Sequence, residues 1–154
     1  MKSIRKKWQN LFFLMTGITL LISCSPTPDF TYSDGENGYF KDFAGKWLVI
    51  NYWADWCHPC IKEIPEINIF AAANPQLHVV GINYDVIPLD KEQAVIKQLN
   101  IKYPVARAQL HKHFGYDMPT SLPTTIIISP EGKVTKILAG PQTVQTLSEN
   151  IGKK

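Results

Sequence analysis

The apolar and polar positions divide the chain into segments typical of strands and of helices. Three apolar, β-branched runs, at 47–53, 77–85 and 123–129, indicate strands buried on both faces. A fourth run, at 134–140, follows the turn sequence SPEGK, so it is predicted to pair back antiparallel as a hairpin.

The longest predicted helix covers residues 57–74, directly after the first buried strand. Pro59 falls in its first turn, where a missing N–H costs nothing. Pro65 lies inside the helix and should kink it.

Three shorter helices are predicted at 89–100, 110–116 and 141–154. Asp90 is a plausible N-cap for the first of them, and Pro141 stands at the start of the last.

The remaining segments carry weaker signals. Residues 25–38 are rich in Pro, Ser, Asp and Gly and are expected to form a tether, with a possible short strand at 29–33. Residues 40–46 indicate a turn or a short helix, and 103–108 a short strand or extended link. The order of elements predicts an α/β fold, with a mixed central sheet flanked by helices.

The amino end has the pattern of an export signal. Four basic residues precede the apolar run 11–22, which is short for a membrane span, and the run ends in LISC at Cys24. This ending resembles a bacterial lipobox, so 1–24 is interpreted as a lipoprotein signal peptide and Cys24 as the lipidated residue. The alternative is an N-terminal anchor or a buried helix with an incidental cysteine.

Three regions follow from this interpretation: the signal peptide 1–24, a tether and N-terminal extension 25–38, and one domain at 39–154. The domain is expected on the periplasm-facing side of a membrane, with the choice of inner or outer membrane left open. The net charge of +3 includes the four basic residues of 1–24, so the rest of the chain sums to −1. No basic region therefore favours nucleic-acid binding.

With Cys24 lipidated, Cys57 and Cys60 are the remaining thiols, and two cysteines do not form a disulfide framework. A bond across so short a loop adds little stability. A structural zinc site needs further ligands, and the alternate histidines His111 and His113 do not face the same way on a helical turn. A redox-active pair is therefore favoured over a metal site.

Cys57 lies where a strand ends and a helix begins. The free N–H groups and the dipole of the helix stabilise a thiolate there. Cys60 is one turn further in and more buried. Cys57 is therefore predicted to exchange with a partner's disulfide, and Cys60 to resolve the mixed disulfide.

Three blocks of sequence carry a family resemblance. NYWADWCHPC resembles the thioredoxin-fold motif W-A-x-W-C-x-P-C, and CIKEIPEI extends it to the C-x-x-E-x-P pattern of the TlpA/ResA-type thiol–disulfide oxidoreductases. SLPTTIIISPEGKV is similar to the proline loop, strand and hairpin of the same family. The resemblance spans about 29–151 and implies a thioredoxin-like fold.

By this resemblance, Cys57 is the nucleophile, Cys60 the resolving cysteine, and Pro123 the proline that faces the sulfurs after a cis peptide bond. The backbone of Leu122 would then pair with an incoming substrate strand. Pro119 is a rival, but Pro123 runs directly into an apolar strand.

The chain departs from thioredoxin at a buried acid–base pair, because Asn51 and Gly81 occupy the places of its Asp and Lys. Glu63, one turn after Cys60, is the expected substitute. It would raise the thiol pKa values and carry a proton to or from Cys60. The alternative is that Glu63 is a solvated glutamate in the first turn, favoured by the helix dipole. Glu66 is expected to be solvated.

Trp56 is expected to form an exposed rim for partner proteins. His58, if protonated, would make the pair more oxidising, but Pro59 before the second cysteine matches reducing members of the family. We therefore expect a reductase of exported proteins, apocytochrome c among the candidates. A membrane thiol would supply its electrons, and no dissociable cofactor is expected. An oxidase or isomerase using the same site, and a copper carrier of the Sco type, are the alternatives.

Overall fold

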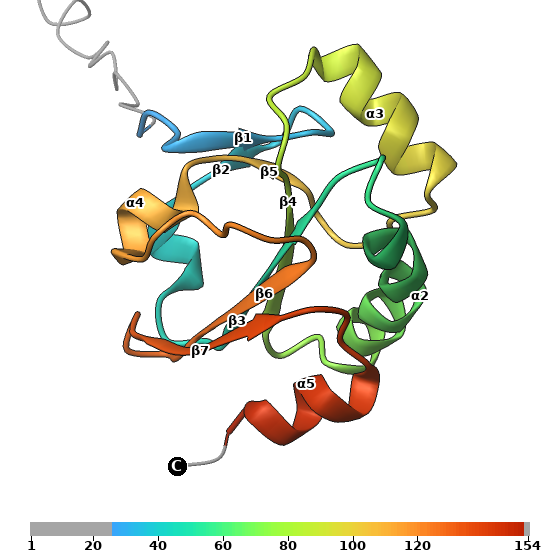
Figure 1. The fold of residues 1–154 in the computed structure, drawn as a ribbon. Helices are drawn as coiled ribbons and strands as arrows, with labels where there is room; N and C mark the ends of the chain where they lie inside the picture. The colour runs from blue at the N-terminus through green and yellow to red at the C-terminus, as the bar shows by residue number, and fades with distance from the viewer. Residues whose placement is uncertain (1–25, 153–154) are drawn as a thin grey trace, which may run out of the picture.

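The computed structural model describes residues 26–152, so the predicted signal peptide and Cys24 lie outside the described residues. The main sheet has the strand order β4-β3-β6-β7 (Figure 1). These strands are β3 (Leu48–Trp53), β4 (His78–Asn83), β6 (Thr124–Ile128) and β7 (Val134–Ala139). β3 and β4 are parallel, and the other pairs are antiparallel, which confirms the mixed sheet and the closing hairpin.

A smaller antiparallel sheet has the order β2-β1-β5, with β1 (Phe30–Tyr32), β2 (Asn37–Gly38) and β5 (Ala106–Arg107). The predicted strand at 29–33 is confirmed as β1. The segment 103–108 supplies only the two residues of β5. β2 was not predicted, because two residues carry no periodicity.

The helices cover both faces of the main sheet (Figure 1). They are α2 (His58–Ala73), α3 (Leu89–Gln98), α4 (Leu110–Phe114) and α5 (Val144–Asn150), with the short 3₁₀ helix η1 (Phe40–Phe43). One core cluster joins the sheet to α2 and α5, and a second joins it to η1, α4 and β1. Within residues 26–152, no helix has the length and apolar content needed to cross a bilayer.

β3 is buried along its whole length, as predicted. Its residues alternate between the two faces of the sheet. Leu48, Ile50 and Tyr52 belong to the core on the η1 and α4 side. Val49 and Trp53 belong to the core on the α2 side, so Asn51 between them is directed toward α2.

The N-termini of two helices differ from prediction. Asp90 is not the N-cap of α3, because the helix begins at Leu89 after Pro88, and the carboxylate lies in the first turn. Pro141 does not begin α5. Thr143 is the N-cap and forms a reciprocal capping box with Thr146. This cap needs a side-chain oxygen that accepts a backbone N–H, which proline does not have. α2 continues through Pro65 without interruption.

Candidate active site

Cys57 and Cys60 are joined by a disulfide at the start of α2, with 5.3 Å between their Cα atoms. Cys57 is the N-cap residue, and its Sγ accepts a hydrogen bond of 3.3 Å from the backbone N–H of Cys60. Pro59 lies in the first turn, as predicted. Cys57 is 4% exposed and Cys60 is completely buried, so the expected difference in burial is present but small.

The surface beside Cys57 carries an exposed aromatic ring. Trp56 is 60% exposed, which agrees with the predicted rim, whereas Trp53 is fully buried. The indole Nε1 of Trp56 donates a 2.6 Å hydrogen bond to Oδ2 of Asp85, which follows the adjacent parallel strand β4. His58 is also exposed. Asp85 was not singled out in the sequence, since only the strand pairing brings it to Trp56.

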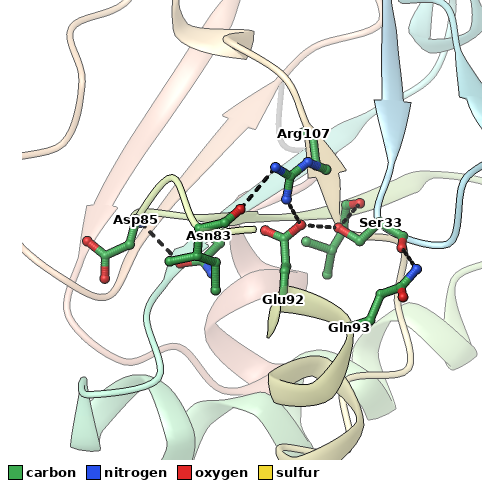
Figure 2. A network of polar contacts seen from close by, with 8 residues as sticks. Ser33, Asn83, Asp85, Glu92, Gln93 and Arg107 are labelled. Carbon is green, nitrogen blue, oxygen red and sulfur yellow. Dashed lines mark hydrogen bonds and ion pairs between the residues drawn. The ribbon is translucent and has the colours of Figure 1, made fainter. Parts of the chain in front are cut away.

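A partly buried polar network contacts the loop that carries Asp85 (Figure 2). Arg107 donates to Oε2 of Glu92 at 2.6 Å and to the carbonyl oxygen of Ile87 at 3.0 Å. The hydroxyl of Ser33 donates to the same Oε2 at 2.7 Å. These contacts join β5 and the residue after β1 to α3 and to the segment after β4 that contains Asp85.

The proline loop before β6 contains the cis peptide bond Leu122–Pro123. The predicted cis bond at Pro123, rather than at Pro119, is therefore confirmed. Leu122 packs against the core cluster that contains both cysteines. The carbonyl oxygen of Pro123 accepts a 2.9 Å hydrogen bond from the backbone N–H of Gly140, which ties this loop to the end of β7.

Glu63 is a buried carboxyl group, only 2% exposed, so the alternative of a solvated glutamate is wrong. Its Oε1 accepts from Nδ2 of Asn51 at 2.6 Å, and its Oε2 accepts from the backbone N–H of Gln142 at 2.8 Å. Burial raises the pKa of Glu63 to about 7, and the two hydrogen bonds partly oppose that rise. The carboxyl group therefore titrates close to neutral pH.

Asn51 and Gly81 pair across β3 and β4, which supports the alignment that gave them the places of thioredoxin's Asp and Lys. A Cβ atom at Gly81 would lie 2.9 Å from Cε2 of Tyr103 and 3.0 Å from Nε1 of Trp53, so a lysine does not fit. The hydroxyl of Tyr103 donates to Oδ1 of Asn51 at 3.0 Å. Tyr103 is thus part of the site, and nothing in its local sequence indicated this.

Glu66 was expected to be solvated, and that expectation is wrong. It is half-buried, and its Oε2 accepts a 2.9 Å hydrogen bond from the backbone N–H of Val144, the first residue of α5. The expectation failed because α5 packs on α2. The first N–H of α5 has no partner within its own helix, and this packing brings it to the carboxylate of Glu66.

The fold and the site define a class of protein. A sheet covered by helices, a CxxC disulfide at a helix start and a cis-proline loop are the features of a thioredoxin-like thiol–disulfide oxidoreductase. The family model described as the AhpC/TSA family matches residues 25–137. The chain belongs to this family.

The relatives agree with that class. The chain is 33% identical over 137 residues to the thiol-disulfide oxidoreductase ResA of Bacillus thuringiensis subsp. konkukian, covering 82% of this chain and 75% of that protein. It is 28% identical over 166 residues to ResA of Bacillus subtilis, covering 89% of each. A thiol:disulfide interchange protein of the thioredoxin family from Chlorobium tepidum matches in structure with a TM-score of 0.67 and 26% identity, over 82% of this chain and 94% of that one. The protein is therefore a thiol–disulfide oxidoreductase of the ResA type with a Cys57–Cys60 pair.

Proposed function

We propose that the protein reduces disulfide bonds in exported proteins. The thiolate of Cys57 attacks one sulfur of the partner's disulfide, and the other partner sulfur leaves as a thiolate that takes up a proton. Cys60 then attacks Sγ of Cys57, which closes the Cys57–Cys60 disulfide and releases the reduced partner. The pair gives up two electrons, and the reaction needs no dissociable cofactor.

The observation that carries this proposal is the position of the disulfide at the N-terminus of α2. The sulfur of Cys57 accepts a backbone hydrogen bond there, and the same contact would stabilise the thiolate after reduction. Cys57 is 4% exposed and Cys60 is completely buried, so Cys57 is the sulfur that a partner can reach.

Glu63 is proposed as the proton acceptor and donor for Cys60. It lies one turn further along α2, it is buried, and burial brings its pKa to about 7. An ordinary thiol titrates near pH 8.5, so a carboxylate with a pKa of about 7 can accept the thiol proton near neutral pH at a modest cost.

The partner is proposed to dock on the exposed face around Cys57. Trp56, His58 and Pro59 are exposed there. The backbone of Leu122, beside Pro123, would pair with an extended segment of the partner. A strand carrying a disulfide would then lie across the reactive sulfur.

The reducing direction is proposed from Pro59, which precedes the second cysteine. The competing function is a disulfide oxidase or isomerase, and the exposed His58 beside Cys57 favours it, because a protonated imidazole stabilises the thiolate. Apocytochrome c is a candidate substrate, and a membrane thiol protein is the proposed source of electrons.

An extracytoplasmic, lipid-anchored location is proposed from the N-terminal sequence and the LISC ending. The test is incorporation of a radiolabelled fatty acid into the expressed protein. Wild-type protein should carry the label and pellet with membranes, and Cys24→Ala should carry none. Equal labelling of both would contradict lipidation at Cys24.

The enzymatic proposal is tested by reduction of insulin disulfides with dithiothreitol as electron donor. Wild-type protein should accelerate the reaction, and Cys57→Ala should not. If both proteins are equally inactive, the reductase proposal fails. One bound copper per chain in such an inactive protein would favour the metal carrier instead.

A further inference from the structure

A chain of buried side chains connects Tyr103 to Glu63 through a single amide group. Tyr103 donates to Oδ1 of Asn51 at 3.0 Å, and Nδ2 of Asn51 donates to Oε1 of Glu63 at 2.6 Å. All three side chains are less than 5% exposed. Solvent therefore does not compete for these groups, and their hydrogen-bond partners come from the protein itself.

An asparagine amide has a donating end and an accepting end, and its neighbours decide which way it turns. A phenol hydroxyl that donates to Oδ1 leaves Nδ2 for the opposite neighbour, where the ionised Glu63 needs a donor. Nδ2 also lies 3.4 Å from Oγ1 of Thr125, a hydroxyl that can accept as well as donate. Thr125 alone therefore does not fix the orientation of the amide.

We propose that Tyr103 is a positioning residue for Glu63: its hydroxyl holds Oδ1 of Asn51 and so keeps the amide N–H₂ directed at the carboxylate. This inference rests on the proton-transfer role proposed for Glu63. Tyr103 acts only through Asn51, and the aromatic ring at this place also fills the space that Gly81 leaves open.

Tyr103 suits this task because its hydroxyl keeps its proton, and so remains a donor, across neutral pH. Burial, with the charge of Glu63 as a second cause, raises the pKa of Tyr103 far above its ordinary value. The groups that hydrogen-bond to Glu63 from the packed elements are Asn51 of β3 and the backbone N–H of Gln142, and both are neutral; Tyr103 is the titratable group whose pKa the charge of Glu63 raises. On its own helix, Cys60 lies one turn earlier.

Removing the hydroxyl of Tyr103 should destabilise the carboxylate form of Glu63 relative to the protonated form. In Tyr103→Phe, Oδ1 of Asn51 loses its donor, and the amide can turn its carbonyl toward a protonated Glu63. The protonated acid then gains an acceptor, while the carboxylate loses a donor. The titration midpoint of Glu63 should therefore move upward by roughly one pH unit, the equivalent of one hydrogen bond.

The experiment is a carboxyl ¹³C NMR titration of the oxidised protein, in which the disulfide removes the thiols from the titration. The Glu63 signal is identified by its absence in Glu63→Gln. Tyr116→Phe is the matched control, because it removes a phenol from the 2.9 Å Tyr52–Tyr116 hydrogen bond of the other core cluster. Tyr103→Phe should raise the midpoint, and Tyr116→Phe should leave it unchanged.

A second comparison tests the route through Asn51. In an Asn51→Ala background, Tyr103→Phe should produce no further shift, and a shift that persists there would overturn the inference. An unmoved midpoint in Tyr103→Phe would overturn it too. If that variant does not fold, the side-chain amide signals of Asn51 in wild-type protein are followed instead. They should shift with the titration of Glu63, and signals that do not shift would overturn the inference.

These results are separable from the fate of the proposed function. The titration uses oxidised protein and needs no turnover. An inactive wild-type protein in the insulin assay would contradict the proposed reductase function. An active protein in which Tyr103→Phe leaves the titration midpoint of Glu63 unchanged would contradict only the positioning role.

Discussion

Glu63 should make the stability of the oxidised protein fall as pH rises through neutrality. Its pKa is about 7 in the folded protein, against 4.5 for an ordinary glutamate. Between these values the folded state binds the proton and the unfolded state has released it, so each step up in pH favours unfolding. This difference in pKa corresponds to about 3 kcal/mol of folding free energy, which is present at low pH and absent at high pH. Most of it is lost between about pH 5 and pH 8.

The assay is urea denaturation of the oxidised protein at a series of pH values, for wild type and for Glu63→Gln. The variant cannot ionise at this position, so subtracting the two curves removes the contributions of the histidines and other groups. The free energy of unfolding of the wild type, minus that of the variant, should decline by about 2 kcal/mol or more from about pH 5 to pH 8. Glu149→Gln is the control for a Glu-to-Gln change at an exposed position of the same protein. A flat difference for Glu63→Gln would refute a buried carboxyl that titrates near neutral pH.

Three further outcomes are expected. Gly81→Ala should cost about 1–3 kcal/mol by urea denaturation, because its methyl group would lie 2.9 Å from the ring of Tyr103; a cost below about 0.5 kcal/mol would contradict the packing. Glu66→Ala should destabilise by about 1 kcal/mol and Glu66→Gln by less, since only glutamine keeps an acceptor for the N–H of Val144; equal losses would contradict that contact. Cys60→Ser should accumulate mixed disulfides with exported proteins, detected by non-reducing electrophoresis, and their absence would argue against the resolving role.

The reactive cysteine pair and the elements around it could be predicted because their sequence signals are local. The three buried strands, the helix start at Cys57 and the proline loop each appear as a short run of adjacent residues. The Cys57–Cys60 spacing stands directly in the sequence, and the cis bond at Leu122–Pro123 was implied by the family resemblance of the proline loop.

The polar surroundings of Glu63 could not be predicted, because they depend on contacts between distant residues. Tyr103 is 52 positions from Asn51, and Gln142 is 79 positions from Glu63. Gln142 contributes a backbone N–H, a group that every non-proline residue has. Glu66 was misjudged for a similar reason, because its partner is the first N–H of a helix near the end of the chain.

The reduction potential of the Cys57–Cys60 pair, measured by equilibration with glutathione buffers, tests the proposed function most directly. A reductase should have a potential near that of thioredoxin, about −270 mV, so that the pair gives electrons to most strained or exposed disulfides. A potential near about −120 mV, in the range of a strong oxidase, would contradict the proposed direction of electron flow.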